Sequence, residues 1–196
     1  MALRILVFNG SNRSGSYSGK VADAALRELA KHEVEVTRIS FIDYPLPLMD
    51  EDLEREKGVP ENAMKLARLF AAHDGIFIAT PEYNGSIPPL LKNVIDWVSR
   101  VSRDGDRPLK PYQGKVVGLA SSSNGHFAGI RAINHLRAVL IHIGLQVVSE
   151  QCSVPNGPQA FDEMDRLADE RARSNLERTV RSLVEHAAFE AGKRVK

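Results

Sequence analysis

Short apolar runs alternate with helix-patterned stretches along the whole chain of 196 residues. The apolar runs are continuous, a pattern typical of strands that are buried on both faces of a sheet. Strands separated by helical segments favour a parallel sheet, because each crossover connection has room for a helix. The chain is therefore predicted to form one α/β domain, residues 1–196, built on an open doubly wound sheet.

The order of these segments also predicts where a ligand binds. The expected strands span residues 3–8, 34–39, 75–80, 116–121 and 145–150, and the expected helices span residues 18–32, 61–73, 88–102, 128–142 and 162–191. Residues 43–60 and 103–113 are expected to form loops. Ligands of open parallel sheets bind at the carboxyl ends of strands, where the strand order reverses. The loops after the first, third and fourth strands are therefore the candidate site.

The loop after the first strand, residues 10–18, is rich in Gly and Ser and contains one arginine. Amides at a helix start and the helix dipole attract anions, and hydroxyls with a guanidinium are phosphate ligands. The alternative is an ordinary polar turn in which a serine caps the helix. The spacing matches neither a Walker loop nor Gly-x-Gly-x-x-Gly, so the loop alone does not name a phosphorylated ligand.

The other two loops add groups that suit a planar ligand. After the third strand, Tyr83 offers a flat face for a ring system or a partner subunit, and Asn84 offers hydrogen bonds to a polar edge. After the fourth strand, residues 121–129 form a Gly/Ser turn that permits close approach of the backbone to a ligand. Each loop alone is also compatible with an ordinary connection, but their coincidence at one sheet edge favours a binding site.

Two motifs in these loops resemble the NADPH-dependent FMN reductase family, most closely its bacterial chromate and quinone reductase branch. The first is Gly10-Ser11-x-Arg13-x-x-Ser16-Tyr17, and the second runs from Pro81-Glu82-Tyr83-Asn84 to Asp96-Trp97. The resemblance extends from about residue 3 to about residue 185. It implies a flavodoxin-like fold with strand order 2-1-3-4-5 and helices on both faces, bound FMN, and a homodimer or homotetramer.

The same resemblance implies which residues bind FMN. The residues expected at the phosphate are Ser11, Arg13, Ser16, Tyr17 and Ser18. The residues expected along the isoalloxazine are Pro81, Glu82, Tyr83 and Asn84. The stretch Ser121 to Gly125, with Ser121, Ser122, Ser123 and Gly125 as the named contacts, is expected on the ring and ribityl side. The chain departs from the family pattern at Ser18, where many relatives carry Asn, and at Pro89, where relatives often have Gly.

The expected activity is transfer of two electrons from NADPH or NADH through FMN to a small acceptor: a quinone, chromate, an azo compound or free flavin. Because the flavin carries the chemistry, no catalytic acid or base is assigned. Glu82 is expected to serve structure or a subunit contact, and Tyr83 and Trp97 are candidate interface anchors. The basic residues that either bind a 2′-phosphate or form a solvated loop are Arg100, Arg103, Arg107 and Lys110.

Composition argues against several other partners. The net charge of +1 gives no reason to expect nucleic acid or a membrane surface. Cys152 is the only cysteine, and His135 and His142 lack further ligands, so neither a disulfide nor a metal site is expected. The N-terminal residues lack the apolar core of a signal peptide, and no apolar run has the length of a membrane helix. A cytoplasmic protein is the expectation.

Three other protein classes share part of this pattern. A flavodoxin-type electron carrier uses the same phosphate loop but usually has a strongly acidic face for its partner, and it stays open as the alternative function. A low-molecular-weight phosphatase needs a cysteine within the phosphate loop, far from Cys152. A receiver domain needs an acceptor Asp after the third strand, where this chain has Thr80-Pro81. The last two classes fit poorly.

Overall fold

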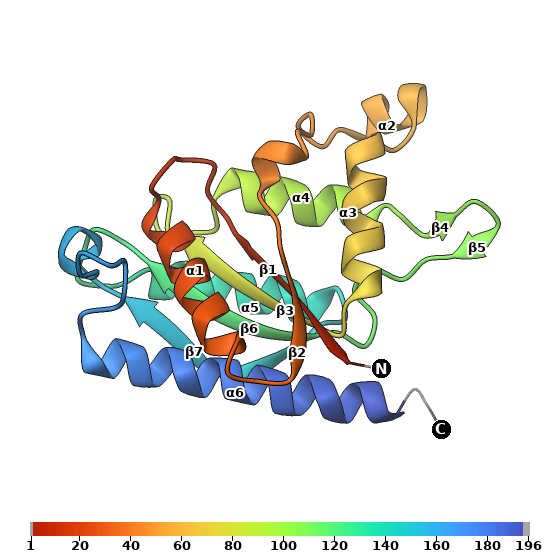
Figure 1. Cartoon of the computed structure of the whole chain (residues 1–196). Helices are drawn as coiled ribbons and strands as arrows, with labels where there is room; N and C mark the ends of the chain where they lie inside the picture. Colours follow the sequence, from red (N-terminus) through yellow and green to blue (C-terminus); the bar gives the residue numbers. More distant parts are fainter. Residues whose placement is uncertain (1, 194–196) are drawn as a thin grey trace.

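The computed structural model describes residues 2–193 and is built around a five-stranded parallel sheet (Figure 1). The strands are β1 (Leu3–Asn9), β2 (Val34–Arg38), β3 (Gly75–Pro81), β6 (Val116–Ser122) and β7 (Gln146–Val154). They lie in the order β2-β1-β3-β6-β7, and every neighbouring pair is parallel. The predicted flavodoxin-like order 2-1-3-4-5 is therefore confirmed.

Helices cover both faces of this sheet (Figure 1). The helices of one face are α1 (Tyr17–Leu29) and α6 (Glu170–Lys193), and those of the other face are α3 (Glu61–Ala72), α4 (Pro89–Ser99) and α5 (Ile130–His142). Along β1, Leu6 and Phe8 pack toward α3 and α4, whereas Ile5 and Val7 pack toward α1 and α6. Because both faces bury apolar side chains, the strand sequence reads as a continuous apolar run.

The expectation of a plain loop over residues 43–60 is wrong. The segment contains helix α2 (Glu51–Lys57) and follows a short 3₁₀ turn, η1 (Phe41–Asp43). Asp50 caps α2 by accepting a hydrogen bond from the Asp52 amide at 2.8 Å. None of the residues of α2 is buried. Its sequence therefore lacks the apolar stripe by which a helix that packs on a core is predicted.

The expected start of the last helix at Asp162 is also wrong, because α6 begins at Glu170. The carboxylate of Asp162 accepts hydrogen bonds from the amides of Met164 and Arg166, both at 2.9 Å. Asx bonds of this kind hold a turn in place of helical bonds. The turn follows the 3₁₀ segment η2 (Gly157–Gln159), and β7 extends beyond its expected end to Val154.

The basic loop after α4 lies away from the candidate site. It contains a small antiparallel hairpin, β4 (Arg103–Asp104) and β5 (Arg107–Pro108), which projects from the molecule (Figure 1). Helix α4 leads from the carboxyl end of β3 to the amino end of β6, so the hairpin lies at the opposite sheet edge. Arg100 is also paired with Glu54, at 2.8 Å. The solvated-loop interpretation is therefore favoured over a 2′-phosphate site within the same chain.

Among residues 2–193, no helix combines the length and apolar character needed to cross a membrane.

Candidate functional site

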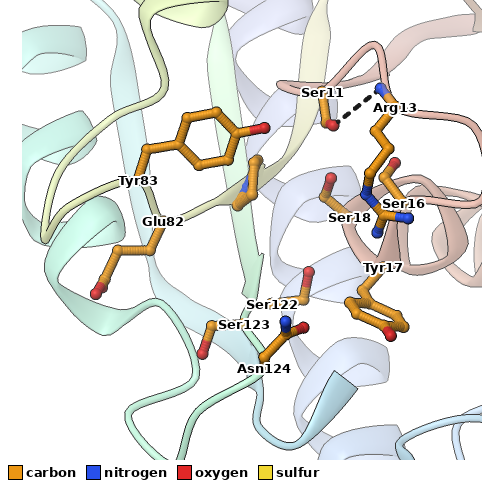
Figure 2. Close-up of a pocket in the computed structure, with 11 residues that line it drawn as sticks. Ser11, Arg13, Ser16, Tyr17, Ser18, Glu82, Tyr83, Ser122, Ser123 and Asn124 are labelled. Carbon is orange, nitrogen blue, oxygen red and sulfur yellow. Dashed lines mark hydrogen bonds between the residues drawn. The ribbon is translucent and has the colours of Figure 1, made fainter. Parts of the chain in front are cut away.

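A cavity of about 260 Å³ lies at the carboxyl ends of β1, β3 and β6 (Figure 2). Its lining residues are Ser11, Arg13, Ser16, Tyr17, Ser18, Pro81, Glu82, Tyr83, Ser122, Ser123 and Asn124. They come from the last residues of β3 and β6, the start of α1 and the loops that follow β1, β3 and β6. The structure therefore brings all three predicted loops to one site.

The loop after β1 is held by its own hydrogen bonds. The side-chain amide of Asn9 donates to the Ser11 carbonyl at 2.7 Å, while its oxygen accepts from Arg38, also at 2.7 Å. The Ser11 hydroxyl accepts from the Arg13 amide at 3.2 Å, and the Ser16 amide donates to the Arg13 carbonyl at 3.1 Å. These bonds set the shape of the loop before any ligand is present.

The start of α1 forms one wall of the cavity. Ser16 is the N-cap in extended conformation, and its hydroxyl accepts from the Gly19 amide at 3.2 Å. The first turn of α1 carries no acidic residue. The positive end of the helix dipole is therefore not neutralised by a carboxylate of its own helix, and it favours an anion in the cavity.

Two buried hydroxyl groups in the cavity wall have no hydrogen-bond partner within the described part of the chain. They are the Oγ atoms of Ser18 and Ser122. Figure 2 shows both residues between Tyr83 on one side and Tyr17 on the other. A buried polar group without a partner costs about 1–3 kcal/mol, so these two hydroxyls point to a polar ligand that completes them.

Arg13 lies over the ring of Tyr17 at the same end of the cavity. Its guanidinium carbon is 5.4 Å from the ring centre, and Nη1 donates to the Ser14 carbonyl at 3.3 Å. Behind the ring lies Gly157, where a Cβ atom would come within 2.4 Å of the Tyr17 ring. Gly157 of η2 thus packs against one side of the Tyr17 ring, and the rest of the ring is next to Arg13 and the cavity.

The loop after β3 makes a tight turn at Tyr83. The amides and carbonyls of Tyr83 and Ser86 bond each other at 3.1 and 3.0 Å, and φ is 50° at Asn84 and 80° at Gly85. Positive φ at both central residues identifies a type I′ turn, for which Asn-Gly is the preferred pair. Asn84 therefore serves the turn and does not line the cavity, unlike the neighbouring Tyr83, whose exposed fraction is 48%.

Glu82 lines the cavity, but its carboxylate pairs with Arg131 of α5. Arg131 donates to it from Nε at 2.8 Å, from Nη2 and from the backbone amide at 3.2 Å. The Arg131 guanidinium, helped by the first amides of α5, holds the pKa of the Glu82 carboxyl below its usual value. The carboxylate is thus ionised and engaged, which agrees with the structural role expected for it.

Some residues at the end of β6 and in the loop after it line the cavity, and others hold this loop in place through hydrogen bonds. Ser121 is fully buried; its hydroxyl donates to the Ala128 carbonyl at 2.7 Å and lies 3.1 Å from the Ser153 hydroxyl. The Ser123 hydroxyl donates to the carbonyl of Gly125, which is exposed and outside the lining. Asn124, which lies within the predicted stretch Ser121 to Gly125, also lines the cavity.

The expectation that Trp97 anchors a subunit interface is wrong. Its side chain is completely buried, and Nε1 donates to the Pro47 carbonyl at 2.8 Å. A buried indole with a satisfied N–H has no surface left for a partner. Tyr83 keeps its exposed ring and remains a candidate for such a contact.

Comparison with known proteins assigns the family. The model of the NADPH-dependent FMN reductase family matches residues 3–159. The chain belongs to this family. Over 148 residues it is 38% identical to the quinone reductase of Escherichia coli K12, covering 76% of this chain and 74% of that protein. Over 183 residues it is 32% identical to an NAD(P)H-dependent FMN reductase of Pseudomonas aeruginosa, covering 92% of this chain and 93% of that protein.

A solved structure shows the same fold. The flavoenzyme NAD(P)H:(acceptor) oxidoreductase FerB from Paracoccus denitrificans superposes with a TM-score of 0.78 at 24% identity, covering 96% of this chain and 99% of that chain. The resemblance inferred from the two loop motifs is therefore confirmed. As a member of the FMN reductase family, the protein is an oxidoreductase that depends on FMN and NAD(P)H.

Proposed function

We propose that the protein binds FMN in the cavity and transfers two electrons from NADPH or NADH to quinones, with chromate, azo compounds and free flavin as further acceptors. One observation carries this proposal. In a chain of this family, the cavity at the carboxyl ends of the strands holds two buried hydroxyls, Ser18 and Ser122, that have no hydrogen-bond partner within residues 2–193. A phosphorylated polyol such as FMN has the hydrogen-bonding groups to complete both.

The phosphate end of FMN fits the wall formed by the β1–α1 loop. The donors that we assign to it are the hydroxyls and amides of Ser11, Ser16 and Ser18, with Arg13 and Tyr17 beside them. The positive end of α1 adds an attraction for a dianion. When bound, FMN supplies the ability to accept and release two electrons.

The ring end fits the wall formed by the other two loops. Pro81, Glu82 and Tyr83 offer a stiff backbone and one aromatic face, and Ser122 and Ser123 offer hydroxyls opposite them. Asn84, Ser121 and Gly125 lie outside the lining and support the loops through turn geometry and hydrogen bonds.

We further propose that the protein works in the cytoplasm as a homodimer or homotetramer. The balanced charge of +1 favours small-molecule acceptors over an electron-transfer partner that is steered by a charged surface. The exposed ring of Tyr83 beside the cavity is the aromatic group that we expect near a subunit contact.

Steady-state oxidation of NADPH tests this function. Protein loaded with FMN is mixed with NADPH and 1,4-benzoquinone, and an equal concentration of free FMN serves as the control. We expect one NADPH consumed per quinone reduced, at a rate far above that of free FMN. An FMN-loaded protein that does not oxidise NADPH with any small quinone would contradict the proposal and favour the flavodoxin-type carrier.

A further inference from the structure

Two side chains of α5 hold both ends of the turn that presents Tyr83. At one end Arg131 binds Glu82, the residue before Tyr83, through Nε at 2.8 Å and through Nη2. At the other end Nδ1 of His135 lies 2.9 Å from the hydroxyl of Ser86, the last residue of the turn. We call the four side chains of Glu82, Ser86, Arg131 and His135 the α5 clamp.

The clamp also completes the start of α5. The N-cap of α5 is Gly129, with φ of 79°, which has no side chain to accept from the first amides of the helix. The carboxylate of Glu82 fills this role by accepting from the Arg131 amide at 3.2 Å. Arg131 is further packed against the ring of Phe127, with its guanidinium carbon 5.2 Å from the ring centre. The turn and the helix start therefore form one connected unit.

Tyr83 is the one residue of the turn between these attachments that lines the cavity. The type I′ turn allows its backbone little freedom, because the Tyr83 and Ser86 amides and carbonyls are bonded to each other. Both flanks of Tyr83 are therefore tied to α5. Arg131 and His135 do not line the cavity themselves, so any effect they have on a ligand passes through the lining residues of this segment, Glu82 and Tyr83.

We propose that the α5 clamp positions Tyr83 and thereby sets the affinity for flat acceptors at the ring end of the cavity. Arg131 and His135 are positioning residues in this scheme, and the phosphate end at Ser18 is unaffected by them. The part that concerns acceptors rests on the proposed function, whereas the part that concerns the turn does not. Separate experiments test the two parts.

Hydrogen exchange of the ligand-free protein tests the mechanical part. The variants are Arg131→Gln and His135→Ala, and the matched controls are Arg181→Gln on α6 and His142→Ala at the end of α5. In both clamp variants we expect exchange in a peptide spanning residues 81–87 to become about three- to tenfold faster, the effect of losing one or two hydrogen bonds. Unchanged exchange in both clamp variants, or an equal change in the controls, would overturn the clamp.

Kinetics with 1,4-benzoquinone test the functional part. In Arg131→Gln we expect the KM for the quinone to rise about three- to tenfold, with kcat unchanged. If Arg131 acts through Tyr83, the same substitution has no further effect on KM in a Tyr83→Ala background. An undiminished effect in that background would overturn the positioning role.

The two failures are distinguishable. A wild-type protein that binds no FMN or reduces no quinone contradicts the proposed function, and the exchange experiment still decides whether α5 holds the turn. If the wild type reduces quinone and both clamp variants have the same quinone KM as the wild type, only the further inference is contradicted.

Discussion

At the scale of single residues, the unpaired hydroxyl of Ser18 carries the most information about the ligand. The side chain is almost completely buried, and its Oγ atom has no hydrogen-bond partner in the described structure. A metal cation or a lone apolar ligand would leave the neighbouring helix dipole or the hydroxyls poorly matched, whereas an anionic acceptor such as a phosphate ester suits both. We therefore expect the Ser18 hydroxyl to contact the phosphate of FMN.

Replacing Ser18 by Ala should have opposite effects on the stability of the ligand-free protein and on its affinity for FMN. Ser18→Ala removes a buried polar group that the ligand-free protein does not satisfy, so the stability of that form should stay equal or rise. The affinity for FMN should fall about tenfold or more, because a hydrogen bond to a charged group is lost. Thermal unfolding of the ligand-free protein and a fluorescence titration with FMN measure the two effects.

Ser182→Ala is the matched control for this substitution. The Ser182 hydroxyl is buried as well, but it donates to Glu150 at 2.7 Å and lies outside the cavity lining. We expect this variant to lose stability and keep its FMN affinity. If Ser18→Ala bound FMN as tightly as the wild type, the assignment of the phosphate end would be wrong.

The sequence motifs identified most residues of the cavity but not what each of them does there. Ser18 was a predicted phosphate ligand, yet its missing partner depends on the packing of α1 against β6, which no local pattern encodes. Glu82 lay in a predicted ring-binding motif, while its carboxylate pairs with Arg131, far along the chain. Trp97 was misplaced for the same reason, because its burial depends on the segment around Pro47.

At the scale of elements, His73 joins the end of α3 to β2. Its ring is buried, Nδ1 lies 2.6 Å from the Leu69 carbonyl, and Nε2 lies 2.8 Å from the Thr37 hydroxyl. A neutral ring that donates from Nδ1 and accepts at Nε2 satisfies both contacts. Burial is the main cause that lowers the pKa of His73, and the charges of Arg4 and Lys115 act in the same direction.

The lowered pKa predicts a loss of stability in weak acid. Below the unfolded pKa of about 6.5, the unfolded chain binds a proton that the folded chain does not, so the free energy of unfolding decreases by up to about 1.4 kcal/mol per pH unit. The decrease continues until the pH reaches the lowered folded pKa. Urea unfolding at pH 7.5 and pH 5.5 measures the effect.

His73→Asn provides the comparison for this prediction, because it removes the titrating group. The variant should be less stable than the wild type at pH 7.5, and the stability difference between the two proteins should shrink at pH 5.5. A difference of the same size at both pH values would show that His73 is not the responsible group.

The elements that could be predicted well are those whose burial leaves a regular pattern of apolar residues in the sequence. Strands β1, β3 and β6 are buried on both faces, and α1 presents a regular apolar stripe with Val21 and Leu29. Helix α2 has no buried residue and depends on its cap at Asp50. The start of α6 was misjudged because the Asp162 side chain holds a turn and Leu167 is buried from a loop.

At the scale of the whole molecule, the strand order creates the site. The chain leaves β1 and β3, which are neighbours, in opposite directions, because α1 covers one face of the sheet and α4 the other (Figure 1). The crevice at this switch point collects residues from Ser11 to Asn124. The two sides of the crevice divide the work: the β1–α1 loop should decide whether FMN stays bound, and the Tyr83 turn should decide which acceptor is favoured.

The most direct test of this account is a calorimetric titration of the ligand-free protein with FMN, run beside an Arg13→Ala variant. The account predicts binding of one FMN per chain to the wild type. It also predicts weaker binding by the variant, by about tenfold or more, since a charged phosphate contact is lost. Absence of FMN binding by the wild type, or equal affinity in the Arg13→Ala variant, would contradict the central claim that the β1–α1 loop holds the phosphate of FMN.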